Sequence, residues 1–444
     1  MKKRFFGTDG IRGKTGVYPI TPDFFVRLAY ATGLILTKHH QSKNNPTVVI
    51  GKDTRISGYM FESALEAGFS AAGVDTYLTG PIPTPAIAYL TQKLDAEIGV
   101  AITASHNPFD DNGIKIFTRL GTKLAEETEV EIEELLDKDL VLVAPENLGK
   151  ARRLDDAYER YIRFCLNTVP KELDFKRYKV VIDCAHGATY QVAPKLFRSL
   201  GANIIAINVE PDGLNINREA GSNHPSSLVN AVKQNQADLG IAFDGDGDRI
   251  LVVNQDGEII DGDQILYILL NYYQQQNWLK GGLVGTQMTN LALEEKCLAM
   301  AIPFYRSKVG DRYVAQALRE KKWMLGGENS GHIVLLNHHS TGDGIISALQ
   351  LLSALEASQL SLNEALSEFI LYPQKLINLP IKDAIDPETK TIKGLTREAE
   401  LIMRGKGRVL IRPSGTQPLL RIMTEGPDEE LVVKAVEFLA DRIS

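Results

Sequence analysis

The sequence predicts an α/β protein built from three similar units and a smaller α+β domain at its end. The chain of 444 residues exceeds what a single hydrophobic core normally supports, which indicates three or four domains. Short apolar, β-branched segments alternate with stretches of helical periodicity. This alternation begins three times along the chain and gives way to a different pattern after Pro373.

The first unit opens with a short β-branched strand at Thr47–Ile50. Ser57 is the predicted N-cap of the helix that follows, and Gly73 is the residue expected to stop it. Further strands are expected at Thr76–Leu78 and at Ile98–Ile102, the second of which runs directly into a polar loop. Strands that alternate with helices in this way indicate a mostly parallel sheet.

A charged stretch at Glu126–Lys138 predicts a helix with a solvated face, and the strand–helix alternation then restarts. The second unit begins with a strand at Lys179–Ile182 and contains another at Leu239–Phe243, which leads into an acidic loop. The third unit runs from Leu283 through Trp323–Leu325 to a glycine-rich turn. The likeness of the three units indicates an internal repeat.

The segment after Pro373 is smaller and differs in pattern. Two strand-like stretches, Arg408–Ile411 and Leu419–Met423, enclose a polar loop, and a last helix is expected from Asp428. We therefore expect four domains, with bounds at residues 1–150, 151–255, 256–370 and 371–444.

Composition excludes several classes of protein. The formal net charge of −7, without a basic cluster, argues against a nucleic-acid-binding protein. Cys165, Cys184 and Cys297 are far apart in the sequence, which fits a reducing cytoplasm. The apolar stretch 344–360 is too short and too polar to cross a bilayer and predicts an amphipathic helix. We therefore expect a soluble, cytoplasmic protein that binds neither nucleic acid nor membrane.

The acidic loop after the second unit's strand is the sharpest candidate site. Asp244, Asp246 and Asp248 alternate with glycines, which let the backbone bend. Three crowded carboxylates repel one another unless a cation neutralises them, and all-oxygen ligation favours Mg²⁺ first and Mn²⁺ next. An EF-hand is excluded because its sixth position would be Arg249 and its twelfth Gln255. A hydrated turn is the alternative, although it is uncommon directly after an apolar strand.

The polar loop 103–108 contains Ser105 and His106. The loop has no G-x-S-x-G elbow, so nothing marks a catalytic triad. Adjacent side chains in an extended loop diverge, and His106 is therefore expected to order the loop through a hydrogen bond rather than to act as a base. Taken alone, Ser105 is a weak candidate, because serine at a strand end is usually inert.

A loop in the last domain is suited to an anion. Arg412 and Arg421 flank Ser414, Gly415 and Thr416. Arginine forks, hydroxyls and free backbone N–H groups are what a phosphate dianion needs. An ordinary polar hairpin turn is the alternative, because Ser-Gly-Thr is common in turns.

The glycine-rich turn of the third unit contains Glu328 and Ser330, which can approach vicinal hydroxyls of a sugar closely. A tight bend with a solvated glutamate is an equally good interpretation. Arg12, Lys115 and Arg312 lie in further glycine-bearing turns. Each of these cations is individually typical of a protein surface, so their interest is collective.

Six motifs occur in order along the chain. They are FGTDGIRG (Phe6–Gly13), TASHNP (Thr103–Pro108), DGDGDR (Asp244–Arg249), VGDRYV (Val309–Val314), GENSGH (Gly327–His332) and RPSGTQPLLR (Arg412–Arg421). Together they resemble the α-D-phosphohexomutases over essentially the whole chain. The resemblance implies four domains around a central cleft, three of them similar mixed-sheet α/β units and the fourth a smaller α+β domain.

The resemblance also implies roles for individual residues. Ser105 is expected to carry the phosphoryl group that the enzyme transfers. The expected ligands of one Mg²⁺ per subunit are Ser105, through its phosphate, with Asp244, Asp246 and Asp248. The expected acid–base and charge-stabilising groups are Lys115, Arg12 and His332. The residues expected to bind substrate are Arg249, Arg312, Glu328, Ser330, Arg412, Ser414, Gly415, Thr416 and Arg421.

A mutase of this kind is expected to act on a hexosamine phosphate through a bisphosphate intermediate. Lys115 is the candidate base, provided that neighbouring cations depress its pKa. Gln417 replaces the family's usual Glu and Asn329 occupies a variable position, so the preferred sugar stays open. The alternatives are a mutase for another hexose phosphate, a metal-dependent serine phosphatase and a non-catalytic sugar-phosphate-binding protein. The sequence also leaves a homodimer open.

Overall fold

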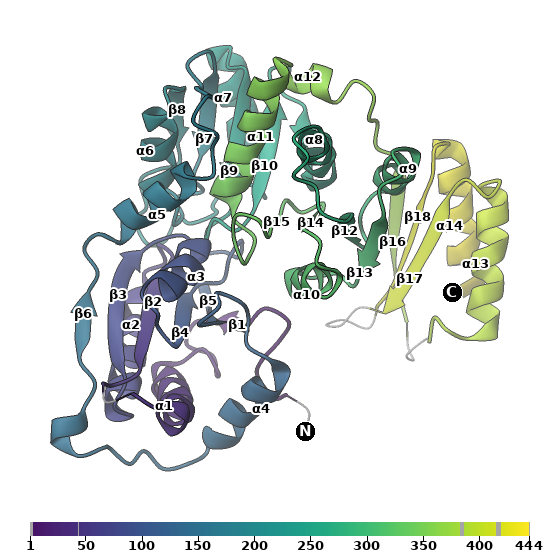
Figure 1. Cartoon of the computed structure of the whole chain (residues 1–444). Helices are drawn as coiled ribbons and strands as arrows, with labels where there is room; N and C mark the ends of the chain where they lie inside the picture. Colours follow the sequence, from purple (N-terminus) through teal and green to yellow (C-terminus); the bar gives the residue numbers. More distant parts are fainter. Residues whose placement is uncertain (1–2, 43, 382–385, 414–418, 444) are drawn as a thin grey trace.

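The computed structural model describes residues 3–42, 44–381, 386–413 and 419–443. These residues form four β-sheets, which follow one another along the chain from the purple N-terminal part to the yellow C-terminal part of Figure 1. The first three sheets belong to α/β units, and the fourth to a smaller α+β domain. The fold class expected from the sequence is confirmed.

One strand arrangement recurs in the first three sheets. Each contains four strands in the order 2-1-3-4, in which strands 1, 2 and 3 are parallel and strand 4 returns antiparallel to strand 3. In the first unit these strands are β2 (Thr47–Lys52), β3 (Asp75–Pro81), β4 (Ile98–Ile102) and β5 (Asp111–Thr118). In the second unit they are β7 (Lys179–Asp183), β8 (Asn203–Ile207), β9 (Leu239–Phe243) and β10 (Ile250–Asn254). In the third they are β12 (Leu283–Thr286), β13 (Phe304–Ser307), β14 (Leu325–Gly327) and β15 (Ile333–Leu335).

Helices connect the parallel strands of every unit, because parallel neighbours need a crossover connection. A helix also precedes the first strand of each unit. These helices are α1 (Pro22–His39), α2 (Ser57–Ala71) and α3 (Thr84–Lys93), then α5 (Ala157–Leu166), α6 (Val192–Ser199) and α7 (Ser226–Asn235), then α8 (Gly262–Gln275), α9 (Leu291–Ala299) and α10 (Asp311–Lys321). The internal repeat expected from the sequence is therefore present in the structure.

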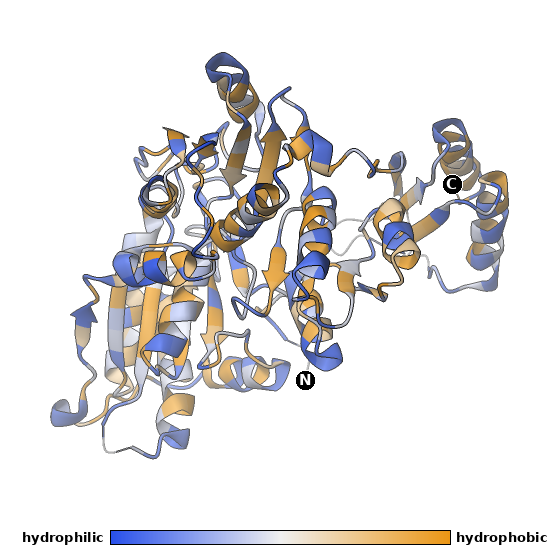
Figure 2. Cartoon of the chain, turned by 45° about the horizontal axis from the view of Figure 1, so that its top comes forward, coloured by the Kyte–Doolittle hydropathy of each residue, from blue (hydrophilic) through white to orange (hydrophobic). Residues whose placement is uncertain are grey.

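The repeat decides where the polar motifs lie. The serine loop connects β4 to β5, the aspartate loop connects β9 to β10, and the glycine-rich turn connects β14 to β15. Each motif thus occupies the equivalent hairpin, between the third and fourth strands of its unit. All residues of β4 and β9 are buried, so these strands hold their loops on a rigid, apolar base. Figure 2 shows this apolar interior as orange strands beneath helices with bluer outer faces.

Additional elements extend the sheets. Strand β1 (Ile11–Lys14) pairs with β5, and β11 (Ile259–Ile260) pairs with β10. Strand β6 (Ala151–Arg153) joins the edge of the first sheet beside β3, just beyond the expected bound at residue 150. Helix α4 (Glu126–Leu135) follows β5, and the 3-10 turn Pro145–Asn147 precedes β6.

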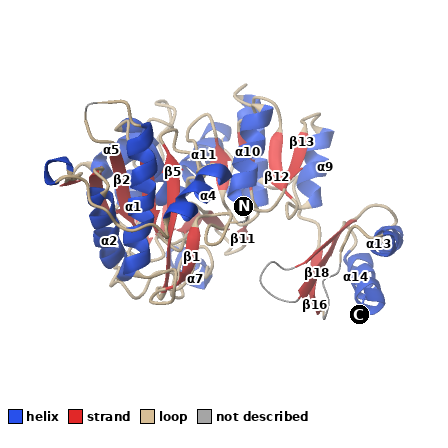
Figure 3. Ribbon diagram, turned by 90° about the horizontal axis from the view of Figure 1, so that it is seen from below, coloured by secondary structure: helices blue, strands red, loops and turns tan. Residues whose placement is uncertain are grey.

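The C-terminal domain is an antiparallel sheet with two helices. Its strands are ordered β16 (Gln374–Pro380), β18 (Leu419–Glu425) and β17 (Arg408–Pro413), and its helices are α13 (Lys390–Ile402) and α14 (Glu429–Ile443). It has its own apolar core, centred on Leu420, Ile422 and Leu439. In Figure 3 this domain stands apart from the three α/β units.

Three local expectations are wrong. Helix α2 begins one residue earlier than expected: Ile56 is its N-cap and Ser57 is already inside the helix. Helix α11 (Gly344–Ser358) is not amphipathic, because every residue from Gly344 to Leu355 is buried. It is covered by α8, α5 and the strands β10 and β15, so no face is left for solvent. The third expectation is wrong only in part: α4 has a solvated face that includes Glu126, Glu127 and Glu134, but Glu129 and Glu133 are buried.

Glu133 shows why a charged helix can be buried. Its carboxylate accepts hydrogen bonds from the backbone N–H groups of Arg4, Phe5 and Phe6, at 2.5, 2.8 and 2.8 Å. The side chain therefore anchors the N-terminal segment, and its charge is satisfied without water. Among the described residues, no helix has both the length and the apolar character needed to cross a membrane.

Candidate active site

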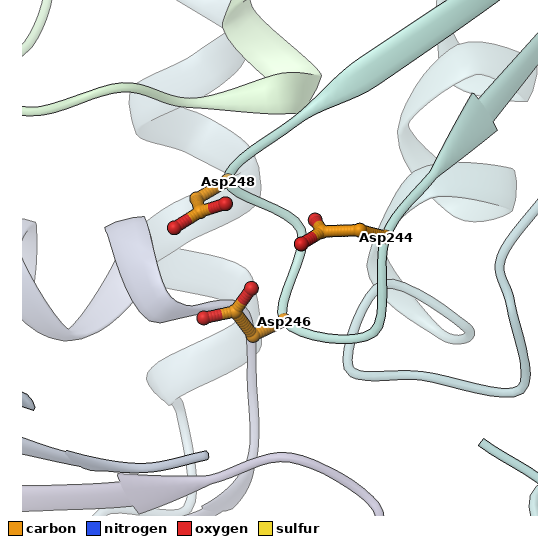
Figure 4. Close-up of side chains that lie close together, drawn as sticks. All are labelled: Asp244, Asp246 and Asp248. Carbon is orange, nitrogen blue, oxygen red and sulfur yellow. The ribbon is translucent and has the colours of Figure 1, made fainter. Parts of the chain in front are cut away.

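The aspartate loop forms a cluster of buried carboxylates. Asp244, Asp246 and Asp248 each offer an oxygen atom that lies within 4.8 Å of the others, and all three residues are buried. Figure 4 shows the three carboxylates turned toward a common space beside the loop. One oxygen each of Asp246 and Asp248, Oδ1, is buried and has no hydrogen-bond partner among the described residues. Such unsatisfied buried oxygens are suited to a hard divalent cation.

Electrostatics in the loop agree with this interpretation. Burial, together with the charges of Asp248 and Asp246, raises the pKa of Asp244 well above its ordinary value. Burial alone would also raise the pKa of Asp248, but the ammonium of Lys115 holds it well below that value. Three carboxylates in so little space are mutually destabilising, and a bound Mg²⁺ would remove the repulsion. The donor set therefore fits the expected metal.

Ser105 faces the aspartate loop across the boundary between the first two units. Its Oγ donates a hydrogen bond to Asp244 Oδ2 at 2.7 Å, and the residue is buried. The backbone of Ser105 has a φ of 52°, in the left-handed region that non-glycine residues seldom adopt. The structure thus brings together the serine and the carboxylates that the sequence placed in separate loops.

The expectation that His106 diverges from Ser105 is wrong. His106 Nδ1 lies 3.3 Å from Ser105 Oγ, because the left-handed backbone of Ser105 curls the loop instead of extending it. Burial, with the charges of Arg249 and Arg12, lowers the pKa of His106 to about 4. The imidazole is therefore neutral near pH 7 and a weak base, in keeping with a role in ordering the loop.

Lys115 is the central cation of the site. Its Nζ lies 2.9 Å from Asp246 Oδ2, 2.8 Å from Asp248 Oδ2 and 3.3 Å from Asp9 Oδ2. Burial alone would lower the pKa of Lys115, but these carboxylates hold it well above its ordinary value. The neighbours that the sequence reasoning assumed to be cations are therefore mainly carboxylates, and the condition of a depressed pKa is not met in this arrangement.

Arg12 and His332 also lie at this centre. Arg12 donates to Asp9 Oδ2 at 3.1 Å. His332 is buried with its Nδ1 3.7 Å from Asp248 Oδ1. Burial alone would lower the pKa of His332, but Asp248 raises it above its ordinary value. Arg12, His332 and Lys115, the three expected acid–base and charge-stabilising groups, therefore converge on one acidic cluster.

Sequence reasoning missed Asp9, which organises this cluster. Asp9 contacts Lys115, Arg12 and Lys123, and Lys123 also pairs with Asp311 of α10. The chain's first motif is thus tied to the third unit. Asp9 stands inside FGTDGIRG, so its proximity to Arg12 was the available signal, but its distant partners could not be read from the sequence.

Arg312 is paired within the protein. Its guanidinium forms a two-pronged contact with the buried carboxylate of Glu129 in α4, one prong of which is 3.2 Å long. Glu129 also accepts from Lys3 at 2.8 Å. The pair joins the third unit to the first. Arg312 was expected to bind substrate, and it can do so only by sharing or leaving this carboxylate.

The glycine-rich turn contacts the residue before α10 and the aspartate hairpin of the second unit. Glu328 is buried and its Oε1 accepts from the backbone N–H of Gly310 at 3.0 Å, whereas Ser330 is exposed. The backbone N–H of Ile250 donates to the carbonyl of Gly331 at 3.1 Å, which docks this turn on the aspartate hairpin. Arg249 lies between, with its Nε 3.8 Å from Asp248 Oδ1.

The two arginines of the last domain face each other. Arg412 of β17 and Arg421 of β18 are directly opposed in the antiparallel register. Burial, with the charge of Arg421, lowers the pKa of Arg412. The Nε of Arg421 is buried and has no hydrogen-bond partner among the described residues. Like charges in cross-strand contact are unfavourable without an anion, so the pair fits a phosphate site. Ser414, Gly415, Thr416 and Gln417 lie outside the described residues.

A polar cavity of about 610 Å³ adjoins this centre between the first and third units. Its lining includes Lys123, Asp311, Arg312 and His332, and His332 contacts the aspartate loop. Cations and carboxylates therefore surround a space large enough for a small polar ligand.

The fold and this site define a class of enzyme. The phosphoglucomutase/phosphomannomutase family matches the chain in four parts: its alpha/beta/alpha domains I, II and III match residues 3–141, 156–257 and 261–372, and its C-terminal domain matches residues 376–442. The chain belongs to this family, within the α-D-phosphohexomutase superfamily, and is an isomerase of the phosphotransferase mutase type.

Individual relatives narrow the likeness. The chain is 54% identical to the phosphoglucosamine mutase of Methylobacillus flagellatus, over 99% of this chain and 98% of the relative. It superposes with a TM-score of 0.81 on a phosphoglucomutase/phosphomannomutase family protein from Burkholderia thailandensis, at 22% identity over 99% of this chain and 96% of the other. The N-acetylphosphoglucosamine mutase of Aspergillus fumigatus, solved with GlcNAc-6P and magnesium, has the same fold, with a TM-score of 0.68 and 17% identity over 100% and 96% of the two chains.

Proposed function

We propose that this chain is a phosphoglucosamine mutase. It interconverts glucosamine 6-phosphate and glucosamine 1-phosphate, a step toward UDP-N-acetylglucosamine, through a phosphorylated Ser105 and a 1,6-bisphosphate. The observation that carries the proposal is the 2.7 Å hydrogen bond from Ser105 Oγ to Asp244, which sets a nucleophile beside a ready-made cation site. Relatives of that name over the full chain length support the choice of sugar.

The reaction begins with Ser105 phosphorylated. Its phosphoryl group passes to O1 of glucosamine 6-phosphate, and the resulting bisphosphate turns around in the site. The 6-phosphoryl group then returns to Ser105 Oγ and glucosamine 1-phosphate leaves. Such transfers depend on positioning and on charge neutralisation more than on covalent assistance from the protein.

Asp244, Asp246 and Asp248, with an oxygen of the phosphoserine, would hold one Mg²⁺. When bound, the ion supplies positive charge to the oxygens of the transferred phosphoryl group. His332 would add positive charge beside Asp248, and Arg12 would add it beside Asp9.

We assign the proton transfer at the attacked hydroxyl to Lys115. Its Nζ contacts Asp246 and Asp248, the side chains that raise its pKa. Neutralisation of those two carboxylates would remove that effect and leave Lys115 a more effective base. Until then it acts as a cation in the site.

The remaining residues would bind the sugar phosphate. Glu328 and Ser330 would form hydrogen bonds with the sugar hydroxyls. Arg249 and Arg312 would contact the negatively charged groups of the substrate. The phosphate that does not react would be held by residues of the last domain, namely Arg412, Ser414, Gly415, Thr416 and Arg421. This second phosphate site is what a mutase needs and a simple phosphatase does not.

The test is a comparison of substrates. The kcat/KM for glucosamine 6-phosphate should exceed that for mannose 6-phosphate and for glucose 6-phosphate, and almost no inorganic phosphate should appear. A preference for mannose or glucose 6-phosphate would reassign the sugar. Continuous release of inorganic phosphate would instead identify a metal-dependent phosphatase.

A further inference from the structure

Arg55 is a fully buried arginine that the proposed chemistry does not use. It lies just before α2, and its guanidinium donates hydrogen bonds to the loop that contains Ser105. The acceptors are the backbone carbonyl oxygens of Ser105 at 3.0 Å, Asn107 at 2.8 Å, Asp111 at 3.0 Å, and Pro108. One side chain therefore binds four backbone carbonyls of this loop. Only arginine has a planar guanidinium with enough N–H donors to do so.

The backbone N–H of Ser105 is bound by the same hydrogen-bond network, through Thr103 and Asp53. Asp53 Oδ2 accepts from Arg55 Nε at 2.9 Å and from Thr103 Oγ1 at 2.7 Å. Thr103 Oγ1 in turn accepts from the backbone N–H of Ser105 at 2.8 Å. The buried charge of Arg55 is thus compensated by Asp53, and both backbone polar groups of Ser105 are satisfied.

Asn217 reaches the same turn from the second unit. Its Nδ2 donates to the carbonyl oxygens of Ser105 and Asn107, at 2.9 Å in each case. These are two of the carbonyls that Arg55 binds. The backbone N–H of Asn217 donates to Ala185 O at 2.9 Å, so the side chain is fixed to the unit that carries the aspartate loop. Asn217 therefore sets the position of the serine loop relative to the carboxylates.

This arrangement has a clear physical consequence. Ser105 occupies a left-handed backbone conformation that is costly for a non-glycine residue and persists only where its surroundings impose it. Its Oγ must stay aligned with Asp244 of the other unit for phosphoryl transfer. We propose that Arg55 and Asn217 are positioning residues that hold the Ser105 carbonyl from two units at once and so align the nucleophile with the metal loop. This inference rests on the proposed phosphoryl relay through Ser105.

The test uses Asn217→Ala with Asn254→Ala as its matched control. Asn254 is also a buried asparagine of the second unit whose Nδ2 makes two hydrogen bonds, to Glu258 at 2.8 Å and to Asn363 at 2.7 Å, far from the serine loop. The full-length proteins are first freed of phosphate with excess glucosamine 6-phosphate and desalted. They are then mixed with glucose 1,6-bisphosphate and Mg²⁺ in a single-turnover experiment, and intact mass follows the uptake of one phosphate.

Asn217→Ala should take up phosphate about tenfold to a hundredfold more slowly than the wild type, because a misplacement of roughly 1 Å costs on that order. Its kcat should fall to match, with KM for the sugar phosphate little changed. Asn254→Ala should keep the wild-type rate. As a second variant, Arg55→Lys keeps the charge but not the fork, and should slow the same step.

Wild-type uptake rates in both Asn217→Ala and Arg55→Lys would overturn the inference. An equal loss in Asn254→Ala would also overturn it, since the effect would then be general destabilisation. If the wild type itself takes up no phosphate, the proposed function fails, which is a distinct result.

Discussion

Gly245, between the first two aspartates, is the point at which the two reacting loops touch. A β-carbon placed on Gly245 would lie 2.6 Å from the carbonyl oxygen of Ser105, 2.7 Å from Asn217 Nδ2 and 2.9 Å from Ile216 Cδ1. Ordinary contact begins near 3.4 Å, so the loops must separate by roughly 0.8 Å to admit a methyl group. The backbone of Gly245 is not left-handed, and alanine is therefore tolerated by its conformation.

We predict that Gly245→Ala leaves the protein folded but slows it. A separation of this size disturbs the 2.7 Å contact between Ser105 and Asp244, and a misplacement near 1 Å costs roughly a hundredfold in rate. The expected loss in kcat is about tenfold to a hundredfold, with KM nearly unchanged, because the sugar and the distant phosphate are bound elsewhere. The assay is steady-state conversion of glucosamine 6-phosphate, beside thermal unfolding.

The matched control is Gly394→Ala in α13, where an added β-carbon meets no atom within 4 Å. Alanine there should keep full activity and raise the free energy of unfolding of the last domain by up to about 1 kcal/mol. A folded Gly245→Ala protein with wild-type kcat would refute the claim that the register of the two loops limits the reaction.

Three further outcomes are expected. Loss of a residue that only hydrogen-bonds to a metal ligand lowers activity by roughly 10–100-fold, so Asp246→Asn, which changes a ligand itself, should lower it by more. The variant should also lose the rise in Tm that Mg²⁺ produces. Activity that does not respond to chelators would contradict the metal site. Arg421→Ala should raise KM about tenfold or more with a smaller effect on kcat, since its contact is the same in substrate and transition state; the reverse pattern would place it at the chemistry. Burial raises the pKa of Asp343 to about 7, so between about pH 4 and pH 7 the folded chain keeps a proton that the unfolded chain loses, and stability from this group falls as pH rises. Asp343→Asn should therefore gain stability relative to the wild type from about pH 4 to about pH 7, by up to about 4 kcal/mol, and a pH-independent difference in Tm would reject that pKa.

The sequence was a reliable guide where local chemistry decides the structure. Ile98–Ile102 and Leu239–Phe243 are strands with the bounds expected, because each is an apolar run that ends at a polar loop. The aspartate loop was predictable for a similar reason. Three carboxylates in alternate positions repel one another unless a cation binds between them, whatever the surrounding fold.

What could not be predicted depends on partners far away in the chain. Glu129 appeared to be one of many solvated acids, and it is buried because Arg312 meets it from another unit, 183 residues away. Arg55 likewise gives no sign in the sequence of the four carbonyls that it holds. The position of His106 followed from a single backbone angle at Ser105, which no side-chain pattern reveals.

The phosphoryl relay has one direct test. The wild-type protein and Ser105→Ala are first treated with excess glucosamine 6-phosphate and desalted. They are then incubated with glucose 1,6-bisphosphate and Mg²⁺, and mass spectrometry of the intact proteins and their peptides locates any phosphate. The wild type should gain a single phosphate on Ser105 and lose it when excess glucosamine 6-phosphate is added, whereas Ser105→Ala should gain none and show no mutase turnover. A phosphate on another residue, or turnover by Ser105→Ala, would contradict the account.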